Sequence, residues 1–148
     1  LEAATLLEAD WNIAADVWSV TSFTEVRRNA LEVERHNMLN PLDQKKSFIQ
    51  EQITDSESPI IASTDYMKSF ADQVSNFIPN HFVSLGTDGY GRSDSREALR
   101  SFFEVDRYYI VIAALKALSD QNKIDVSMVA DAIKKYNIDH TKTNPALS

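Results

Sequence analysis

The stretch that decides the fold is PIIASTDYMKSFADQVSNFIPNHFVSLGTDGYGRSDSREALRSFF, residues 59–103. Two short apolar runs, 60–62 and 81–85, flank a segment with helical spacing of apolar residues, and a glycine-rich turn then leads into another such segment. The order strand, helix, strand, turn, helix is typical of an α/β sheet. Residues 60–62 are apolar on both faces, which favours a central parallel strand covered by helices. The stretch therefore predicts an α/β domain with a mostly parallel sheet.

The turn after the second predicted strand, Gly86–Asp94, holds all 3 glycines of the protein. Glycine used so sparingly indicates a left-handed backbone or a close backbone approach, so at least one of the three is expected to have φ > 0. Asp94 followed by Glu97 three residues later is typical of a capping box. We interpret the turn as a structural turn and helix cap made of Gly86, Asp88, Gly89, Gly91, Arg92 and Asp94.

The same turn has a second interpretation, because backbone N–H groups at a helix N-terminus can hold an anion and Arg92 could assist. The spacing Gly-x-x-Gly-x-Gly, however, is the reverse of the dinucleotide fingerprint, and no Lys-Ser or Lys-Thr of a P-loop follows it. An independent α/β binding module that uses the Gly86–Asp94 turn for an anionic ligand therefore stays open as the alternative function.

The remaining segments predict more helices and one more strand. Residues 15–21 (ADVWSVT) are rich in β-branched and aromatic side chains, which is typical of a strand. Helices are expected over residues 1–11, 23–39, 44–54, 65–78, 94–103, 106–118 and 125–133, with a left-handed stop at Asn12 and N-caps at Ser22, Asp65, Asp106 and Asp125. Side chains expected in the core include those of Phe48, Met67, Phe70, Val74, Val126, Val129 and Ala130.

The length of 148 residues suits one domain, 1–148, whose polar tail, 139–148, is expected to be loosely held. A net charge of -7 argues against nucleic-acid partners and against an anionic membrane surface. The absence of cysteine excludes disulfides and thiolate chemistry and suits a reducing compartment. No apolar run approaches the length of a membrane-spanning helix.

No pattern of a self-contained active site is evident. His36, His81 and His140 fall on separate predicted elements without metal-ligand spacing. Ser93 and Ser95 have no nearby histidine that could act as their base. We therefore expect no catalytic, cofactor-binding or metal-binding residue in this chain.

Five segments carry a family resemblance, namely 16–23 (DVWSVTSF), 62–68 (ASTDYMK), 85–96 (LGTDGYGRSDSR), 103–106 (FEVD) and 129–133 (VADAI). In this order they closely resemble the C-terminal domain of the homodimeric, decarboxylating component of bacterial pyruvate dehydrogenase. The chain is more distantly similar to the third domain of transketolases, where a similar strand ends in an Asp-x-x-Gly-x-Ser turn. The sequence also begins inside a helical pattern, so we expect a piece of a longer polypeptide.

The resemblance implies a three-layer α/β/α sandwich and a cytoplasmic enzyme that uses thiamine diphosphate and Mg²⁺ to decarboxylate pyruvate. The implied partners are the upstream domains of the same chain, a second subunit and the lipoyl acyltransferase that receives the acetyl group. In this family the cofactor ligands and catalytic residues lie in the first two domains, so no catalytic residue is transferred to this chain. The implied role of the domain is structural, with a contribution to the dimer.

The resemblance further implies that the first strands of the sheet are missing from this chain. A central parallel strand would precede Leu1 and lie between residues 15–21 and 59–64, with an antiparallel edge strand beyond 15–21. Val17–Val20 and Ile60–Ala62 are then expected to run parallel about 9–10 Å apart, which is two strand spacings. Direct pairing of these two segments is the alternative outcome.

Overall fold

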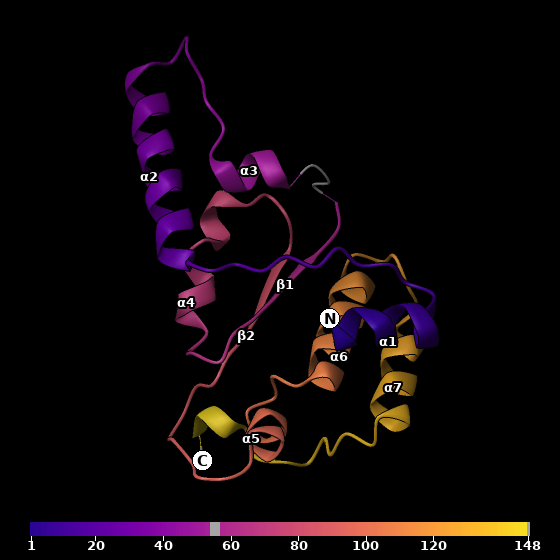
Figure 1. Cartoon of the computed structure of the whole chain (residues 1–148). Coiled ribbons are helices and arrows are strands. Elements are labelled where there is room, and N and C mark those ends of the chain that lie inside the picture. Colours follow the sequence, from indigo (N-terminus) through magenta and orange to yellow (C-terminus); the bar gives the residue numbers. More distant parts are fainter. Residues whose placement is uncertain (54–56, 148) are drawn as a thin grey trace.

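The computed structural model describes residues 1–53 and 57–147, and its centre is a parallel two-stranded sheet. Strand β1 (Ile60–Ser63) pairs with β2 (Phe82–Leu85) in the register that places Ile60 opposite Phe82 and Ser63 opposite Leu85. Helices lie on both sides of this sheet, with α2, α3 and α4 on one side and α1, α6 and α7 on the other (Figure 1). The predicted α/β class and the parallel pairing are confirmed.

Seven helices and two short 3-10 turns are described: α1 (Glu2–Trp11), α2 (Phe23–Leu39), α3 (Phe48–Gln52), α4 (Ser69–Asp72), η1 (Ser75–Phe77), α5 (Arg96–Phe102), α6 (Arg107–Asp120), α7 (Val126–Lys135) and η2 (Pro145–Leu147). Asn12 ends α1 in the left-handed conformation with φ 55°, as predicted. Side chains of Ser22, Asp106 and Asp125 accept hydrogen bonds from the first-turn N–H groups of α2, α6 and α7. These predicted helix boundaries are confirmed, and each depends on a side-chain or backbone contact between neighbours along the chain.

The main hydrophobic core lies between α1, α6 and α7. It contains Ala3, Leu7, Val111, Ala114, Leu115, Val129 and Ala132. Val111 and Leu115 of α6 are fully buried, and Ile61 of β1 packs against this cluster from the sheet. Helix α6 therefore connects the helical layer to the sheet.

A polar network joins the end of α1 to the end of α7. The hydroxyl of Tyr136 donates to Asp10 Oδ2 at 2.8 Å and accepts from Trp11 Nε1 at 2.8 Å. Lys135 Nζ lies 2.8 Å from Asp10 Oδ1. The ring of Tyr108 in α6 packs on the ring of Tyr136 with centroids 4.9 Å apart, so all three helices share this network.

The strand predicted over 15–21 is wrong, because these residues form no regular secondary structure. Val17, Trp18 and Val20 are 53%, 61% and 42% exposed. Among the described residues, no backbone hydrogen bond joins Val17–Val20 to β1. A strand exists only where its backbone groups have ladder partners, and in the described ranges this segment has none. Direct pairing is therefore not observed, and the two-spacing separation stays a prediction.

The single helix predicted over 65–78 is also wrong, since the segment forms α4 and η1 instead. Asp65 is not an N-cap. The hydroxyl oxygen of Thr64 accepts from Tyr66 N, and the carbonyl oxygen of Tyr66 accepts from Thr87 N, so the first turn is held in a non-helical form. Helix α4 consequently begins only at Ser69, beyond these contacts.

Several predicted core positions are exposed. Phe48, Met67, Phe70 and Val126 are 58%, 53%, 41% and 65% exposed, and Ala130 also faces outward. At the start of α3 the buried residue is instead its N-cap, Ser47, and the next residue, Phe48, donates its N–H to the Asn29 side chain of α2. Residues 54–56 and 148, which include Thr54 of the predicted helix 44–54, lie outside the described residues.

Candidate functional site

The glycine-rich turn leaves the carboxyl end of β2 and lies beside the carboxyl end of β1. Thr87 N donates to the carbonyl oxygen of Tyr66 at 2.8 Å, and Thr87 Oγ1 donates to the carbonyl oxygen of Asp65 at 2.9 Å. Asp88 Oδ2 accepts from Lys68 N at 3.4 Å. These bonds join the two segments that follow the parallel strands. In open α/β sheets this edge is where ligands bind.

Two of the three glycines occupy positions that require glycine, one through a close backbone approach and one through a positive φ. A Cβ atom on Gly86 would lie 2.6 Å from Lys68 N and 2.7 Å from the carbonyl oxygen of Tyr66, so the backbone of the segment after β1 excludes a side chain. Gly89 has a φ of 109°, which confirms the expectation of a positive φ in this turn. Gly91, in contrast, faces open space.

The cap of α5 is Ser95 and not Asp94. Ser95 Oγ accepts from Ala98 N at 3.2 Å, as an N-cap side chain does. Asp94 lies one residue earlier, where its Oδ1 accepts from Ser95 N at 2.7 Å. The predicted Asp94–Glu97 capping box is thus displaced by one residue, because Asp94 bonds the adjacent N–H group instead of reaching the first turn.

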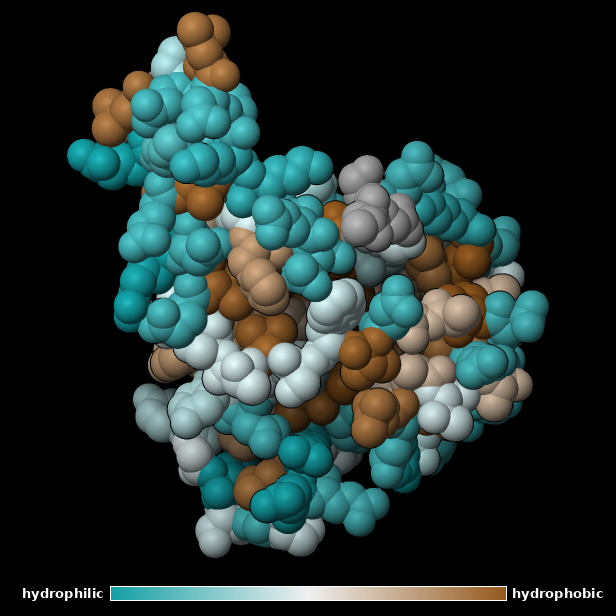
Figure 2. Space-filling model, turned by 45° about the horizontal axis from the view of Figure 1, so that its top comes forward, coloured by the Kyte–Doolittle hydropathy of each residue, from teal (hydrophilic) through white to brown (hydrophobic). Residues whose placement is uncertain are grey.

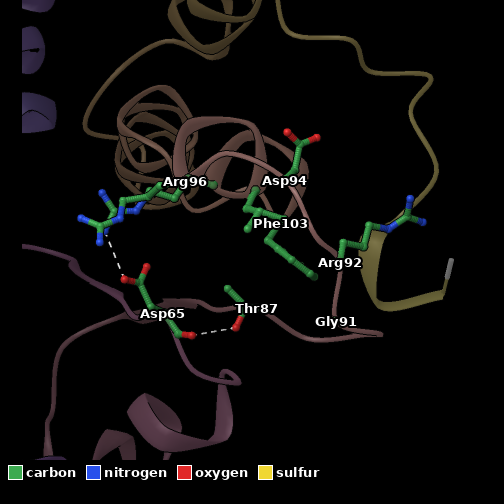
Figure 3. Close-up of a pocket in the computed structure, with 9 residues that line it drawn as sticks. Asp65, Thr87, Gly91, Arg92, Asp94, Arg96 and Phe103 are labelled. Carbon is green, nitrogen blue, oxygen red and sulfur yellow. Dashed lines mark hydrogen bonds and ion pairs between the residues drawn. The ribbon is translucent and has the colours of Figure 1, made fainter.

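A pocket of about 440 Å³ lies between this turn, α5 and the end of β1 (Figure 3). It is lined by Asp65, Thr87, Gly91, Arg92, Asp94, Arg96, Leu99, Arg100 and Phe103. Arg100 pairs with Asp65 across the pocket at 3.1 Å. Arg96 extends toward the end of the pocket that holds Asp65, whereas Arg92 extends away from it. The guanidinium of Arg92 lies 4.1 Å from the centroid of the Phe102 ring.

The C-terminal tail packs beside this turn. Lys142 Nζ donates to the carbonyl oxygens of Ser101 and Phe102 at 2.9 and 2.6 Å, which satisfies groups at the end of α5. Its ammonium group also lies 3.5 Å from a carboxylate oxygen of Glu104. Pro145 is buried, and its carbonyl oxygen lies where a Cβ atom on Gly89 would be. The loose holding of 139–148 stays a prediction, but these contacts give the tail a defined place on the turn.

The predicted turn residues therefore share one edge of the sheet, and the three histidines do not join them. His36 Nε2 lies 3.2 Å from Asp43 Oδ2 near the end of α2. Over residues 1–53 and 57–147, no three side chains of the His, Cys, Asp and Glu types form a group that could hold a metal ion. In the same ranges no helix is long and apolar enough to cross a membrane.

The sequence analysis did not identify Asp65, Arg96 and Arg100 as residues of this pocket. The spacing of four residues between the two arginines was a signal that could have placed them on one helix face.

Comparison with known proteins defines the family. The model of the transketolase-like C-terminal domain family matches residues 1–106, so the chain belongs to this family. The pyruvate dehydrogenase E1 component of Cupriavidus necator is 50% identical to the chain over 146 residues, which is 98% of the chain and 16% of that protein. The corresponding identities are 53% over 146 residues in Pseudomonas aeruginosa (97% of the chain) and 51% over 148 residues in Escherichia coli (99% of the chain).

The resemblance read from the sequence is thereby confirmed. The similarity falls on the C-terminal region of the E1 component. The chain covers 17% of the Pseudomonas and Escherichia proteins, so it spans about one sixth of the length of these relatives.

Proposed function

We propose that this chain is the C-terminal domain of a pyruvate dehydrogenase E1 component. The whole enzyme then decarboxylates pyruvate oxidatively with thiamine diphosphate and Mg²⁺, and transfers the acetyl group to the lipoyl groups of a partner acyltransferase. One observation carries this proposal: about half of the residues are identical to E1 components over 97–99% of the chain. We also propose, from the family resemblance, that the protein that contains this chain is a cytoplasmic homodimer within a multienzyme complex.

Within that enzyme we assign the domain a structural role that supports the dimer. Its pocket places arginine and aspartate side chains near a threonine hydroxyl, without a nucleophile and a base in contact. The domain also presents apolar side chains for docking, since Trp18 is 61% exposed and Leu42 fully exposed. Figure 2 shows hydrophobic groups on the projecting end of the molecule, where α2 ends and where Met38, Leu39 and Leu42 are exposed. Surfaces of this kind mark contacts with other domains or subunits.

The activity is tested on the full-length protein that contains this chain. With added thiamine diphosphate and Mg²⁺, pyruvate should reduce an artificial electron acceptor and acetylate an isolated lipoyl domain, as mass spectrometry would detect. Omission of thiamine diphosphate is the control. A full-length protein that binds the cofactor but leaves pyruvate unchanged would refute the proposal.

The structural role is tested by substitutions in the same full-length protein. Alanine at His36, His81 or His140 should leave kcat within about twofold of wild type, because the proposed structural role places none of these side chains at the substrate. Trp18→Ser should weaken subunit association in sedimentation velocity, whereas Tyr90→Ser, at a residue 83% exposed, should not. A hundredfold loss of kcat in any histidine variant would assign the domain a catalytic role instead.

A further inference from the structure

We propose that the pocket at the carboxyl ends of β1 and β2 binds a small organic anion. Arg96 is the principal ligand of its carboxylate or phosphate group, and Leu99 and Phe103 contact its apolar part. This site goes beyond the structural role proposed above and does not depend on it.

The position of the pocket is the first argument. Asp65 and Thr87 each lie two residues beyond the end of a parallel strand, and both line the pocket. The carboxyl ends of parallel strands point their side chains and loop backbones into one shared crevice, which is the usual ligand position in α/β sheets. The volume of about 440 Å³ is in the range of pockets that hold small molecules.

An arginine without a partner is the second argument. The pocket lining contains three arginines and two aspartates in a chain whose net charge is -7, and one of these arginines, Arg92, points away from the pocket. Asp65 is paired with Arg100, and Asp94 accepts from Ser95 N. In the part of the chain that the structure describes, the guanidinium of Arg96 has no recorded hydrogen bond or ion pair. An incoming anion would supply the missing partner.

The arrangement of the side chains decides where the anion lies. Arg96 and Arg100 are one turn apart on α5 and so share a face of that helix. Figure 3 shows Arg96 reaching toward the Asp65 end of the pocket and Arg92 pointing away from it. An anion bound beside Arg96 can therefore also contact Arg100. It would compete with Asp65, which pairs with Arg100 in this structure. The planar guanidinium suits the paired oxygens of a carboxylate or phosphate.

Apolar side chains decide the kind of ligand. Phe103 is only 9% exposed and Leu99 is half-buried, so the pocket has a firm hydrophobic wall next to its charged end. Inorganic phosphate would contact the arginines alone. A carboxylate or phosphate that carries an aliphatic or aromatic group would also cover this wall, and we infer that ligands of this second type bind more tightly.

The test uses the full-length protein with benzoate and inorganic phosphate as separate probes at constant ionic strength. Benzoate binding is measured by saturation-transfer difference NMR, and phosphate binding by broadening of its ³¹P resonance. Binding at the pocket is identified by its sensitivity to Arg96→Gln. This substitution should weaken the binding of both probes about tenfold or more. The matched control is Arg27→Gln on the exposed face of α2, which should change binding less than twofold.

A second variant separates a specific site from a general effect of charge. Asp65→Asn frees Arg100 and should strengthen benzoate binding several-fold, whereas Asp16→Asn, at an exposed residue far along the sequence from the pocket, should not. The proposal is overturned if Arg96→Gln and Arg27→Gln weaken binding equally, or if Asp65→Asn and Asp16→Asn strengthen it equally. If phosphate and benzoate bind with equal affinity, the proposed contact of Leu99 and Phe103 with an apolar part of the ligand is refuted. Thermal unfolding of each variant confirms that it is folded.

Discussion

Gly86 and Gly91 lie in the same turn, but only Gly86 has backbone of another segment where its side chain would be. The nearest atoms to a Cβ on Gly86 belong to the main chain of Lys68 and Tyr66, which cannot rotate away as a side chain can. Those same Tyr66 atoms bond to Thr87, so displacement would break the contact that joins the two strand ends.

We therefore predict that Gly86→Ala lowers the free energy of unfolding by about 2 kcal/mol, because overpacking against fixed backbone forces the segments apart. Gly91→Ala is the matched control and should change stability by at most about 0.5 kcal/mol, since its Cβ meets nothing within 4 Å. Urea unfolding followed by circular dichroism measures both. Equal effects at the two positions would contradict the close approach.

The start of α5 gives a second comparison between neighbouring residues. Ser95→Ala removes the acceptor for Ala98 N and should cost about 1 kcal/mol, as the loss of an N-cap does. Asp94→Ala removes only the acceptor for the exposed Ser95 N and should cost about 0.5 kcal/mol. The same unfolding measurement ranks the two variants, and a larger loss for Asp94→Ala would restore Asp94 as the cap.

At the scale of elements, the junction between α1 and α7 predicts a dependence of stability on pH. Hydrogen bonds from Lys135 and Tyr136 lower the pKa of Asp10 below its ordinary value of 3.8. The folded state then binds fewer protons at this carboxyl than the unfolded state does. Asp10 therefore adds stability above the unfolded pKa, and this stability is lost as the pH falls through the lowered pKa.

The expected result is a smaller fall of the urea midpoint in Asp10→Asn than in wild type between about pH 5 and pH 2. Asp16→Asn is the control, because this exposed residue has no recorded partner, and its profile should follow that of wild type. Identical profiles for wild type and Asp10→Asn would show that the junction does not stabilise the packing of α1 on α7.

At the scale of the whole molecule, the chain alone should neither bind thiamine diphosphate nor decarboxylate pyruvate. The reason is the family resemblance, which implies that the ligands of the diphosphate and of Mg²⁺ lie in the domains that precede this one in the enzyme. Calorimetry of the 148-residue chain with thiamine diphosphate and Mg²⁺ should give no binding heat, with the full-length protein as the positive control. Micromolar binding to the chain alone would contradict the assigned role.

The sequence by itself determined the features that depend on neighbours along the chain. The caps at Ser22, Asp106 and Asp125 and the stop at Asn12 are local side-chain or backbone conformations, and all were predictable. The parallel strands were predictable too, because apolar runs on either side of a helical segment leave few alternatives. The family followed from five segments, the glycine-rich turn among them, whose combination and order along the chain are specific.

Only the tertiary structure decided the features that join distant parts of the chain. Arg100 meets Asp65 across 35 residues, and Lys142 reaches the end of α5 across about 40, so neither contact leaves a local pattern. Residues 15–21 have the composition of a strand but no strand beside them in the described chain. Strand propensity measures how well side chains fit a pleated surface, and the hydrogen bonds that make the strand must come from another segment. The pocket likewise exists only because folding brings the carboxyl ends of the two strands next to α5.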